Sequence, residues 1–305
     1  MSRQRAATFA LLGAALAATG CGYADARARR PAWTLPGGQV AKTSSLSVRT
    51  LGVGGSPVML LHGLVGSGSY WGGAFDRLAA RHRLVVPDLL GFGASADVGS
   101  NFGPDDHVAA IRSALDELGI VEPVVIGAHS LGALVAIRFA VTDPDRVCGI
   151  VAFGPPLYPD RVAARRHVAG TSPMGRLFVL PGRTAERACR WVCNHRQLAA
   201  TIAAWTHPSL PPEIAAAGVQ HTWDSYSETI DQVVLAASAG AWVAEMRCPL
   251  QLVAGDRDPV VDPTYLRELA NRHQHVTCET WAGTHHLPLM QADRCCRAVE
   301  RAASS

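Results

Sequence analysis

Charged residues are scarce in this chain, and no run of basic residues stands out. Only 17% of its 305 residues are Asp, Glu, Lys or Arg, and the formal net charge at pH 7 is +3. A nucleic-acid partner requires concentrated Lys and Arg, so the sequence argues against one. With 48% hydrophobic residues, the composition also argues against intrinsic disorder and is sufficient for one large core.

Long apolar runs are also missing, since none has the roughly 20 residues that a membrane-spanning helix needs. The nearest approach is residues 6–18, which follow two arginines and end in small residues and Cys21. That order is typical of a secretory signal, and it resembles a bacterial lipoprotein signal except that Ala18 stands where Leu is usual. We expect residues 1–31 to be a signal-like or disordered leader. The protein is then exported or attached to the cell envelope, with a lipid at Cys21 as its membrane contact; a cytoplasmic protein is the alternative.

The cysteines form no disulfide or metal framework that the sequence reveals. Apart from Cys21, seven remain, an odd number that cannot pair completely. Cys189 and Cys193 lie four residues apart with His195 nearby, a spacing that metal sites use. No second cluster at ligand spacing accompanies them, so we expect no metal and no cofactor. The oligomeric state stays open.

Strand and helix patterns alternate from residue 46 onward. The strand patterns are continuous apolar runs, as in a parallel sheet covered on both faces. These runs are residues 45–52, 57–63, 82–89, 122–130, 146–154, 248–256 and 275–283. Helical apolar spacing occupies residues 69–81, 105–118, 131–141, 263–273 and 293–302. The alternation predicts an open, mostly parallel α/β sheet with helices on both faces.

One interval, residues 158–247, breaks this rhythm because it shows only helix-like apolar spacing. So long a stretch cannot be a structureless connection inside a compact domain. We therefore predict a core of residues 32–157 and 248–305 with a helical cap inserted over 158–247. The large apolar residues of this cap suit an apolar acyl or aryl group, although for most of them packing onto the sheet is the simpler explanation. They are Trp191, Leu198, Ile202, Trp205, Trp223, Tyr226 and Trp242.

The stretch "GAHSLGALVAIRFA", residues 127–140, places Ser130 where a strand pattern turns into a helix pattern. A turn this sharp brings backbone atoms close together, so its flanks must be small, as Ala128 and Gly132 are. A serine there projects its hydroxyl above the edge of the sheet, and the first helical amides point toward whatever it attacks. On this stretch alone, a serine that merely caps a buried helix is the alternative.

Two further stretches complete a resemblance to the α/β-hydrolase family, whose nucleophile elbow has the pattern small-x-nucleophile-x-small. "LLHGLVGSGSYW", residues 60–71, is similar to the family's His-Gly oxyanion motif, and "PDLLGFGAS", residues 87–95, is similar to its D-x-x-G-x-G-x-S loop. The resemblance implies an oxyanion hole made by the backbone N–H groups of Leu64 and Leu131. Donors fixed in this way are worth roughly 3 to 4 kcal/mol each.

The resemblance also assigns an acid and a base. In "LVAGDRDPVVDP" the family's acid follows the strand-ending glycine by three residues, which is Asp258; a rarer variant of the family would use Asp160. In "WAGTHHLPLMQADR" the family pattern H-x-L-P-L-E-x-P-D aligns the base with His285, and His286 is the alternative.

Five other polar residues near these motifs are expected to have no catalytic role. The resemblance gives His62 and Asp88 structural roles and turns the side chain of His129 away from the pocket. Asp256 is expected to form a turn, and Asp262 to cap the helix that begins at the following proline.

The resemblance therefore implies a serine hydrolase. Ser130 would attack a carbonyl carbon, His285 would transfer the proton, Asp258 would orient the imidazole, and water would release the acyl group. The expected substrate is an apolar small-molecule carboxylic ester. Serine in place of aspartate disfavours the haloalkane dehalogenase and epoxide hydrolase branches. A C–C bond hydrolase, a cofactor-free haloperoxidase or perhydrolase, and a non-catalytic ligand-binding module all stay open.

Overall fold

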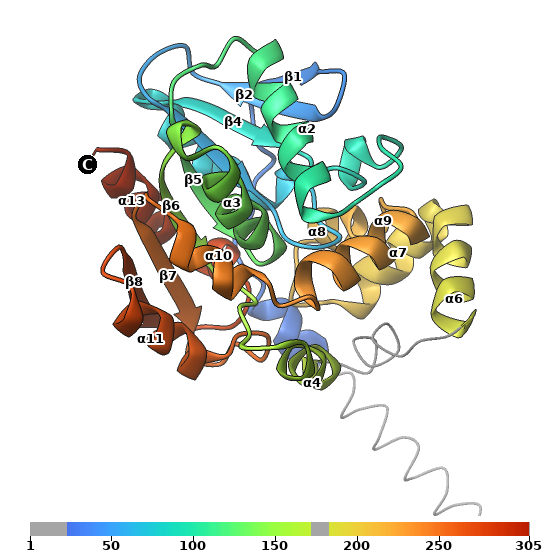
Figure 1. Cartoon of the computed structure of the whole chain (residues 1–305). Helices are drawn as coiled ribbons and strands as arrows, with labels where there is room; N and C mark the ends of the chain where they lie inside the picture. The colour runs from blue at the N-terminus through green and yellow to red at the C-terminus, as the bar shows by residue number, and fades with distance from the viewer. Residues whose placement is uncertain (1–22, 172–182, 305) are drawn as a thin grey trace, which may run out of the picture.

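A computed structural model of the chain describes residues 23–171 and 183–304 (Figure 1). The apolar stretch of the leader and Cys21 lie outside these residues, so export and lipidation stay predictions. Within the described ranges, no helix combines the length and the apolar character needed to cross a bilayer.

Eight strands form one sheet in the order β1-β2-β4-β3-β5-β6-β7-β8. The pairs β1–β2 and β2–β4 are antiparallel, and all the other pairs are parallel. The strands are β1 Gln39–Lys42, β2 Ser47–Leu51, β3 Pro57–Leu61, β4 Arg83–Pro87, β5 Val124–His129, β6 Val147–Phe153, β7 Leu250–Gly255 and β8 Val276–Trp281. All seven predicted runs are strands, which confirms the mostly parallel sheet. The sequence missed β1 because this edge strand is largely exposed and lacks a continuous apolar run.

Four of the five helices predicted for the sheet are present within two residues of their expected ends. They are α2 Pro104–Glu117, α3 Leu131–Thr142, α11 Pro263–Arg272 and α13 Ala292–Ala303; the short α12 Leu287–Met290 precedes α13. The fifth, predicted over 69–81, is instead two 3-10 helices, η1 Gly68–Trp71 and η2 Gly73–Ala80. Gly72 separates them with a φ of 57°, a left-handed conformation that no continuous helix contains. Two further 3-10 turns are η3 Gly93–Ser95 and η4 Pro144–Arg146.

The sheet is buried on both faces, which explains its continuous apolar strands. In β3, Met59 and Leu61 belong to the same core cluster as the buried faces of α2 and α3. Val58 and Leu60 point the other way, into the cluster that contains the buried residues of η1, η2 and α13. Figure 1 shows α2, α3 and α10 together on one face of the sheet.

The segment between β6 and β7, residues 158–247, has no strand in its described part. It contains α4 Arg161–Thr171, α6 Arg183–Asn194, α7 Arg196–Thr206, α8 Pro212–Ala217, α9 Trp223–Thr229, the π-helix η5 Ile230–Val234 and α10 Ala239–Glu245. The division of the chain into a core and a cap formed by this segment stays a prediction.

Packing onto the sheet was the wrong expectation for four of the seven large apolar residues of this segment. Trp191, Leu198, Ile202 and Trp205 are 44 to 69% exposed. They lie on α6 and α7, at some distance in the fold from the sheet (Figure 1). Trp223 and Trp242 are half-buried against the core, and Tyr226 is buried.

Candidate active site

Ser130 stands between the last residue of β5 and the first residue of α3 in a strained backbone conformation, with φ 52° and ψ −121°. A non-glycine residue in such a region costs on the order of 1–3 kcal/mol, so the surrounding structure must hold it there. The small flank at Gly132 is required, because a β-carbon added there would lie 2.6 Å from the carbonyl oxygen of His62. The fold therefore presents the Ser130 hydroxyl on a tight turn.

The structure brings Ser130, His285 and Asp258 together in one hydrogen-bonded chain. Nε2 of His285 lies 3.0 Å from Oγ of Ser130, and its Nδ1 lies 2.9 Å from Oδ2 of Asp258. The Asp258 side chain has no exposure, and that of His285 is 17% exposed. A carboxylate at Nδ1 favours the tautomer with its proton on that atom, which leaves a lone pair on Nε2 facing the hydroxyl.

Two local features hold the Asp258–His285 pair in place. The other carboxylate oxygen of Asp258 accepts a hydrogen bond from the backbone N–H of Val260 at 2.8 Å. Gly154, at the end of β6 with a φ of 60°, leaves the space for the pair. A β-carbon there would lie 3.0 Å from Nδ1 of His285 and 3.1 Å from Oδ2 of Asp258.

The alternative acid, Asp160, has a different position. Its Oδ1 accepts two backbone N–H groups in the first turn of α4, each at 2.8 Å, and it is exposed. Asp256 accepts the backbone N–H of Gly283 at 2.7 Å, and this bond lowers the pKa of its carboxyl group. Asp262 accepts two N–H groups at the start of α11, so it is the helix cap that the sequence predicted.

The alternative base, His286, is turned toward a tyrosine. Its Nδ1 lies 3.3 Å from Oη of Tyr70, whereas the neighbouring His285 meets Ser130. Burial, together with the adjacent His285, lowers the pKa of His286 to about 4. His286 is therefore neutral at pH 7 and packs beside the site.

His129 has a contact that the sequence did not predict. Its Nε2 donates a hydrogen bond to the backbone carbonyl oxygen of His285 at 2.9 Å. Its ring stacks on Tyr70, with 4.5 Å between the ring centroids. Burial, reinforced by His285 and His286, lowers its pKa well below the usual value. A neutral His129 thus links the elbow to the loop that carries His285. In the sequence, the position of His129 next to Ser130 indicated that it lies near the site, but no local pattern identified His285 as its partner.

His62 and Asp88 tie loops together, in agreement with the structural roles that the resemblance implied. The Nδ1 proton of His62 is donated to the carbonyl of Gly63 at 2.8 Å, and its Nε2 accepts the N–H of Leu89 at 2.9 Å. Asp88 accepts the backbone N–H groups of Gly68, at the start of η1, and of Ala94, in η3, each at 2.6 Å. Burial lowers the pKa of His62 and so favours this neutral form.

The backbone N–H groups of Leu64 and Leu131 were the predicted oxyanion donors. Within the described residues, neither donates a hydrogen bond to a protein acceptor. Leu131 directly follows Ser130. The loop that carries Leu64 runs against the serine, since a β-carbon on Gly63 would lie 3.1 Å from Cβ of Ser130. Both N–H groups are therefore free to donate to another acceptor, and their role as an oxyanion hole stays a prediction.

Residues 56–293, most of the chain, match the sequence profile of the alpha/beta hydrolase fold family. The chain belongs to this family. Its mostly parallel sheet with helices on both faces and its serine at a strand-to-helix turn agree with this family.

Among curated proteins, this α/β hydrolase is similar to the human (Lyso)-N-acylphosphatidylethanolamine lipase. The two are 33% identical over 110 residues, which is 35% of this chain and 32% of that protein. An uncharacterized Mycobacterium tuberculosis protein is also 33% identical, over 93 residues, 30% of this chain and 27% of that one. The chain thus matches about a third of the length of these relatives.

Among solved structures, an esterase from Rhodococcus sp. ECU1013 aligns with a TM-score of 0.64 and 20% identity, covering 87% of this chain and 98% of that one. A bromoperoxidase from Bacillus anthracis aligns with a TM-score of 0.66 and 16% identity, covering 88% and 100%. At such identities, the similarity shows the shared hydrolase fold alone.

Proposed function

We propose that this α/β hydrolase is a serine hydrolase that cleaves a carboxylic ester of an apolar small molecule through an acyl-enzyme. The observation that carries this proposal is the position of His285, whose two ring nitrogens lie 3.0 Å from Oγ of Ser130 and 2.9 Å from Oδ2 of Asp258. A serine hydroxyl is a weak nucleophile at neutral pH unless a base removes its proton as it attacks.

In the proposed reaction, Oγ of Ser130 forms a bond to the ester carbonyl carbon while its proton moves to Nε2 of His285. The carbonyl oxygen becomes an oxyanion held by the N–H groups of Leu64 and Leu131. The buried carboxylate of Asp258 stabilises the imidazolium that forms. His285 then protonates the departing alkoxide, and a water molecule attacks the acyl-enzyme by the same route to release the acid.

The segment of residues 158–247 is the proposed cap over the entry to this site. It leaves the sheet just after Gly154, the glycine packed against the Asp258–His285 pair. Substrate choice then depends on this segment, as loops and insertions carry specificity in hydrolase folds. The esterase and the lipase among the similar proteins favour an ester over other acyl substrates.

A panel of p-nitrophenyl esters of increasing acyl length, combined with labelling by a fluorophosphonate, tests the proposal. We expect turnover and labelling of one serine, and loss of both in Ser130→Ala with a decrease in kcat of about 10⁴-fold or more. Ser113→Ala, on α2, is the matched control and should keep both. Well-folded protein that hydrolyses no ester and resists labelling would contradict the proposal and favour a binding module.

Two other outcomes separate the related chemistries. Labelling of Ser130 without turnover of any ester would point to a C–C bond hydrolase that shares the first steps. Formation of a peracid from acetate and hydrogen peroxide at a higher kcat/KM than ester hydrolysis would point to a perhydrolase. Either result replaces the ester assignment while keeping the nucleophile.

A further inference from the structure

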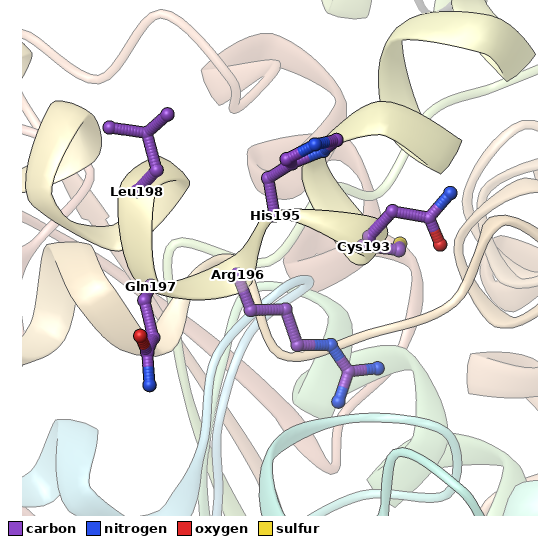
Figure 2. Close-up of a pocket in the computed structure, with 6 residues that line it drawn as sticks. Cys193, His195, Arg196, Gln197 and Leu198 are labelled. Atoms are coloured by element: carbon purple, nitrogen blue, oxygen red, sulfur yellow. The ribbon is translucent and has the colours of Figure 1, made fainter.

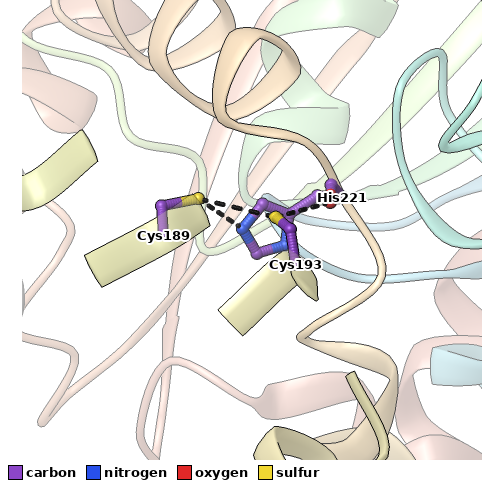
Figure 3. A group of neighbouring side chains, drawn as sticks. All are labelled: Cys189, Cys193 and His221. Atoms are coloured by element: carbon purple, nitrogen blue, oxygen red, sulfur yellow. Dashed lines mark hydrogen bonds between the residues drawn. The ribbon is translucent and has the colours of Figure 1, made fainter. Parts of the chain in front are cut away.

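Two cysteines and a histidine meet inside the segment of residues 158–247 (Figure 3). Sγ of Cys189 lies 3.4 Å from Nε2 of His221 and 4.0 Å from Sγ of Cys193. The two sulfur atoms and one ring nitrogen all lie within 4.8 Å of one another. Cys189 and His221 are buried, and Cys193 is half-buried. Thiolate sulfur and imidazole nitrogen are the ligands that Zn²⁺ prefers.

The two separations from Sγ of Cys189 are close to those of a tetrahedral zinc site. With Zn–S bonds of about 2.3 Å and Zn–N bonds of about 2.0 Å, tetrahedral angles put two sulfur ligands about 3.8 Å apart and a sulfur and a nitrogen about 3.5 Å apart. The observed distances, 4.0 Å and 3.4 Å, differ from these by about 0.2 Å. The third pair, Sγ of Cys193 and the ring nitrogen of His221, lies within 4.8 Å, and Cys193 donates to the carbonyl oxygen of His221 at 3.2 Å. Binding of an ion would therefore require the Cys193 side chain to turn from that carbonyl toward the ring.

The fold holds the three side chains in this arrangement. Cys189 and Cys193 lie one turn apart on α6, so their side chains share one face of the helix. His221 comes from the connection between α8 and α9 and forms an isolated β-bridge with Phe92. The preceding Gln220 accepts the backbone N–H of Gly93, at 2.9 Å. An ion here would join α6 to the α8–α9 connection, which the β-bridge attaches to the loop that follows β4.

Cys193 also gives the cluster access to solvent. It lines a hollow of about 380 Å³ at the connection between α6 and α7, shown in Figure 2. His195, the histidine that the sequence placed with the cysteines, lines the same hollow, but its Nδ1 lies 2.9 Å from the carbonyl oxygen of Trp191, on which its ring stacks. The structure thus replaces His195 by His221 and leaves an open side where a water molecule can complete four ligands.

We propose that Cys189, Cys193 and His221 bind one Zn²⁺ ion, with water from the adjoining hollow as the fourth ligand. The ion cross-links α6 to the α8–α9 connection, which pairs with Phe92 in the loop after β4, and so fixes the helical segment beside the sheet. It takes no part in the proposed ester chemistry, so its test is independent of that activity.

Metal titration of the full chain tests this site. Protein kept reduced and freed of metal is titrated with Zn²⁺ against a chromophoric chelator, and with Co²⁺ to detect sulfur-to-cobalt charge-transfer absorption. We expect one ion per chain and the thiolate absorption band. Loss of an outer-shell partner weakens metal binding by about 10- to 100-fold, so Cys189→Ser and Cys193→Ser should each weaken it by about 100-fold or more.

Matched variants separate this site from incidental binding. His195→Gln and Cys148→Ser alter a histidine and an exposed cysteine outside the cluster and should leave the affinity within about threefold, below the outer-shell effect. Zn²⁺ should raise the Tm of the native chain and of these controls, and leave that of Cys193→Ser unchanged. Cys189→Ser places a hydroxyl in a buried position, so circular dichroism in the presence of a chelator checks that this variant folds without metal. If Cys189→Ser unfolds, the test depends on Cys193→Ser, whose position is half-buried.

Two results would overturn the proposal. One is stoichiometric binding that survives Cys193→Ser but is lost in His195→Gln or Cys148→Ser. The other is that folded, reduced protein binds no Zn²⁺. In that case the protein is denatured and its cysteines are counted with a thiol reagent; reaction of all of them shows that oxidation did not prevent binding.

Discussion

His129 donates a hydrogen bond from Nε2 to the backbone carbonyl oxygen of His285, and the two atoms are 2.9 Å apart. The donor belongs to the residue before Ser130, and the acceptor to the residue whose ring meets that serine. The turn at Ser130 and the loop that carries His285 are thus joined by two hydrogen bonds. One connects the side chains of Ser130 and His285, and the other connects the His129 side chain to the His285 backbone. The loop position therefore depends on a residue that does not itself reach the hydroxyl.

His129→Phe should lower kcat for ester hydrolysis by about 10-fold while leaving KM nearly unchanged. The phenyl ring keeps the stack on Tyr70 but leaves the His285 carbonyl without its donor, which costs about 1–3 kcal/mol for a buried group. Steady-state kinetics and urea unfolding measure the two effects. His286→Phe, which also keeps an aromatic ring near Tyr70, is the control and should change kcat by less than about threefold. Equal effects of both variants would show that ring packing alone matters.

Asp258→Asn should decrease kcat by about 10⁴-fold, because an amide at this position no longer stabilises the imidazolium or its tautomer. The amide is close in size to the carboxylate, so circular dichroism should stay unchanged. Asp256→Asn and Asp160→Asn are matched controls, since both carboxylates accept backbone N–H groups, and Asp256 also pairs with Arg257 at 3.4 Å. A larger loss in Asp160→Asn than in Asp258→Asn would reverse the assignment of the acid.

The free energy of unfolding should fall as the pH decreases below about 6.5, the usual pKa of an unfolded histidine. His107 is fully buried, and burial lowers its pKa to about 3. Between these two pH values the unfolded chain binds a proton that the folded chain excludes, so this histidine contributes a slope of about 1.4 kcal/mol per pH unit. The pKa is lowered in the same direction for four more histidines, namely His62, His129, His221 and His286.

Urea unfolding of the native chain and of His107→Phe at pH 7.5, 6.0 and 5.0 measures this slope. The variant keeps an aromatic ring beside Phe92, on which His107 stacks. Below pH 6.5 the free energy of unfolding of the variant should decrease less steeply than that of the native chain, and the two slopes should differ by the contribution of about one proton. Above pH 7 the two curves should run parallel. Parallel curves at pH 5.0 would mean that His107 takes up its proton in the folded state.

Gly132→Ala should destabilise the fold by about 1–3 kcal/mol and abolish most of the activity, because the core beside the elbow has no room for a methyl group. The added carbon would lie 2.6 Å from the carbonyl oxygen of His62 and 2.7 Å from that of Leu61. Gly54→Ala, where the added carbon meets nothing within 4 Å, is the control. Denaturant unfolding and ester kinetics on both variants check the prediction, which a fully active Gly132→Ala would refute.

Local patterns were sufficient for most of the fold. Continuous apolar runs predict strands that are buried on both faces, and apolar residues every three to four positions predict α2, α3, α11 and α13. The same spacing failed over residues 69–81, because Gly72 takes a left-handed φ that breaks the helix in two. The small flanks of Ser130 revealed the sharp turn, since that turn is itself a local structure.

By itself, the sequence determined which segments are strands and helices, where the serine stands, and two candidates each for the acid and the base. Only the tertiary structure showed that Asp258 and His285, and not Asp160 or His286, lie in one hydrogen-bonded chain with Ser130. It also showed that His221, not His195, faces the two cysteines, and that His129 supports His285. These partners are 28 to 156 residues apart along the chain, so no local periodicity encodes their contact. Their meeting depends on how the sheet and its connections pack in three dimensions.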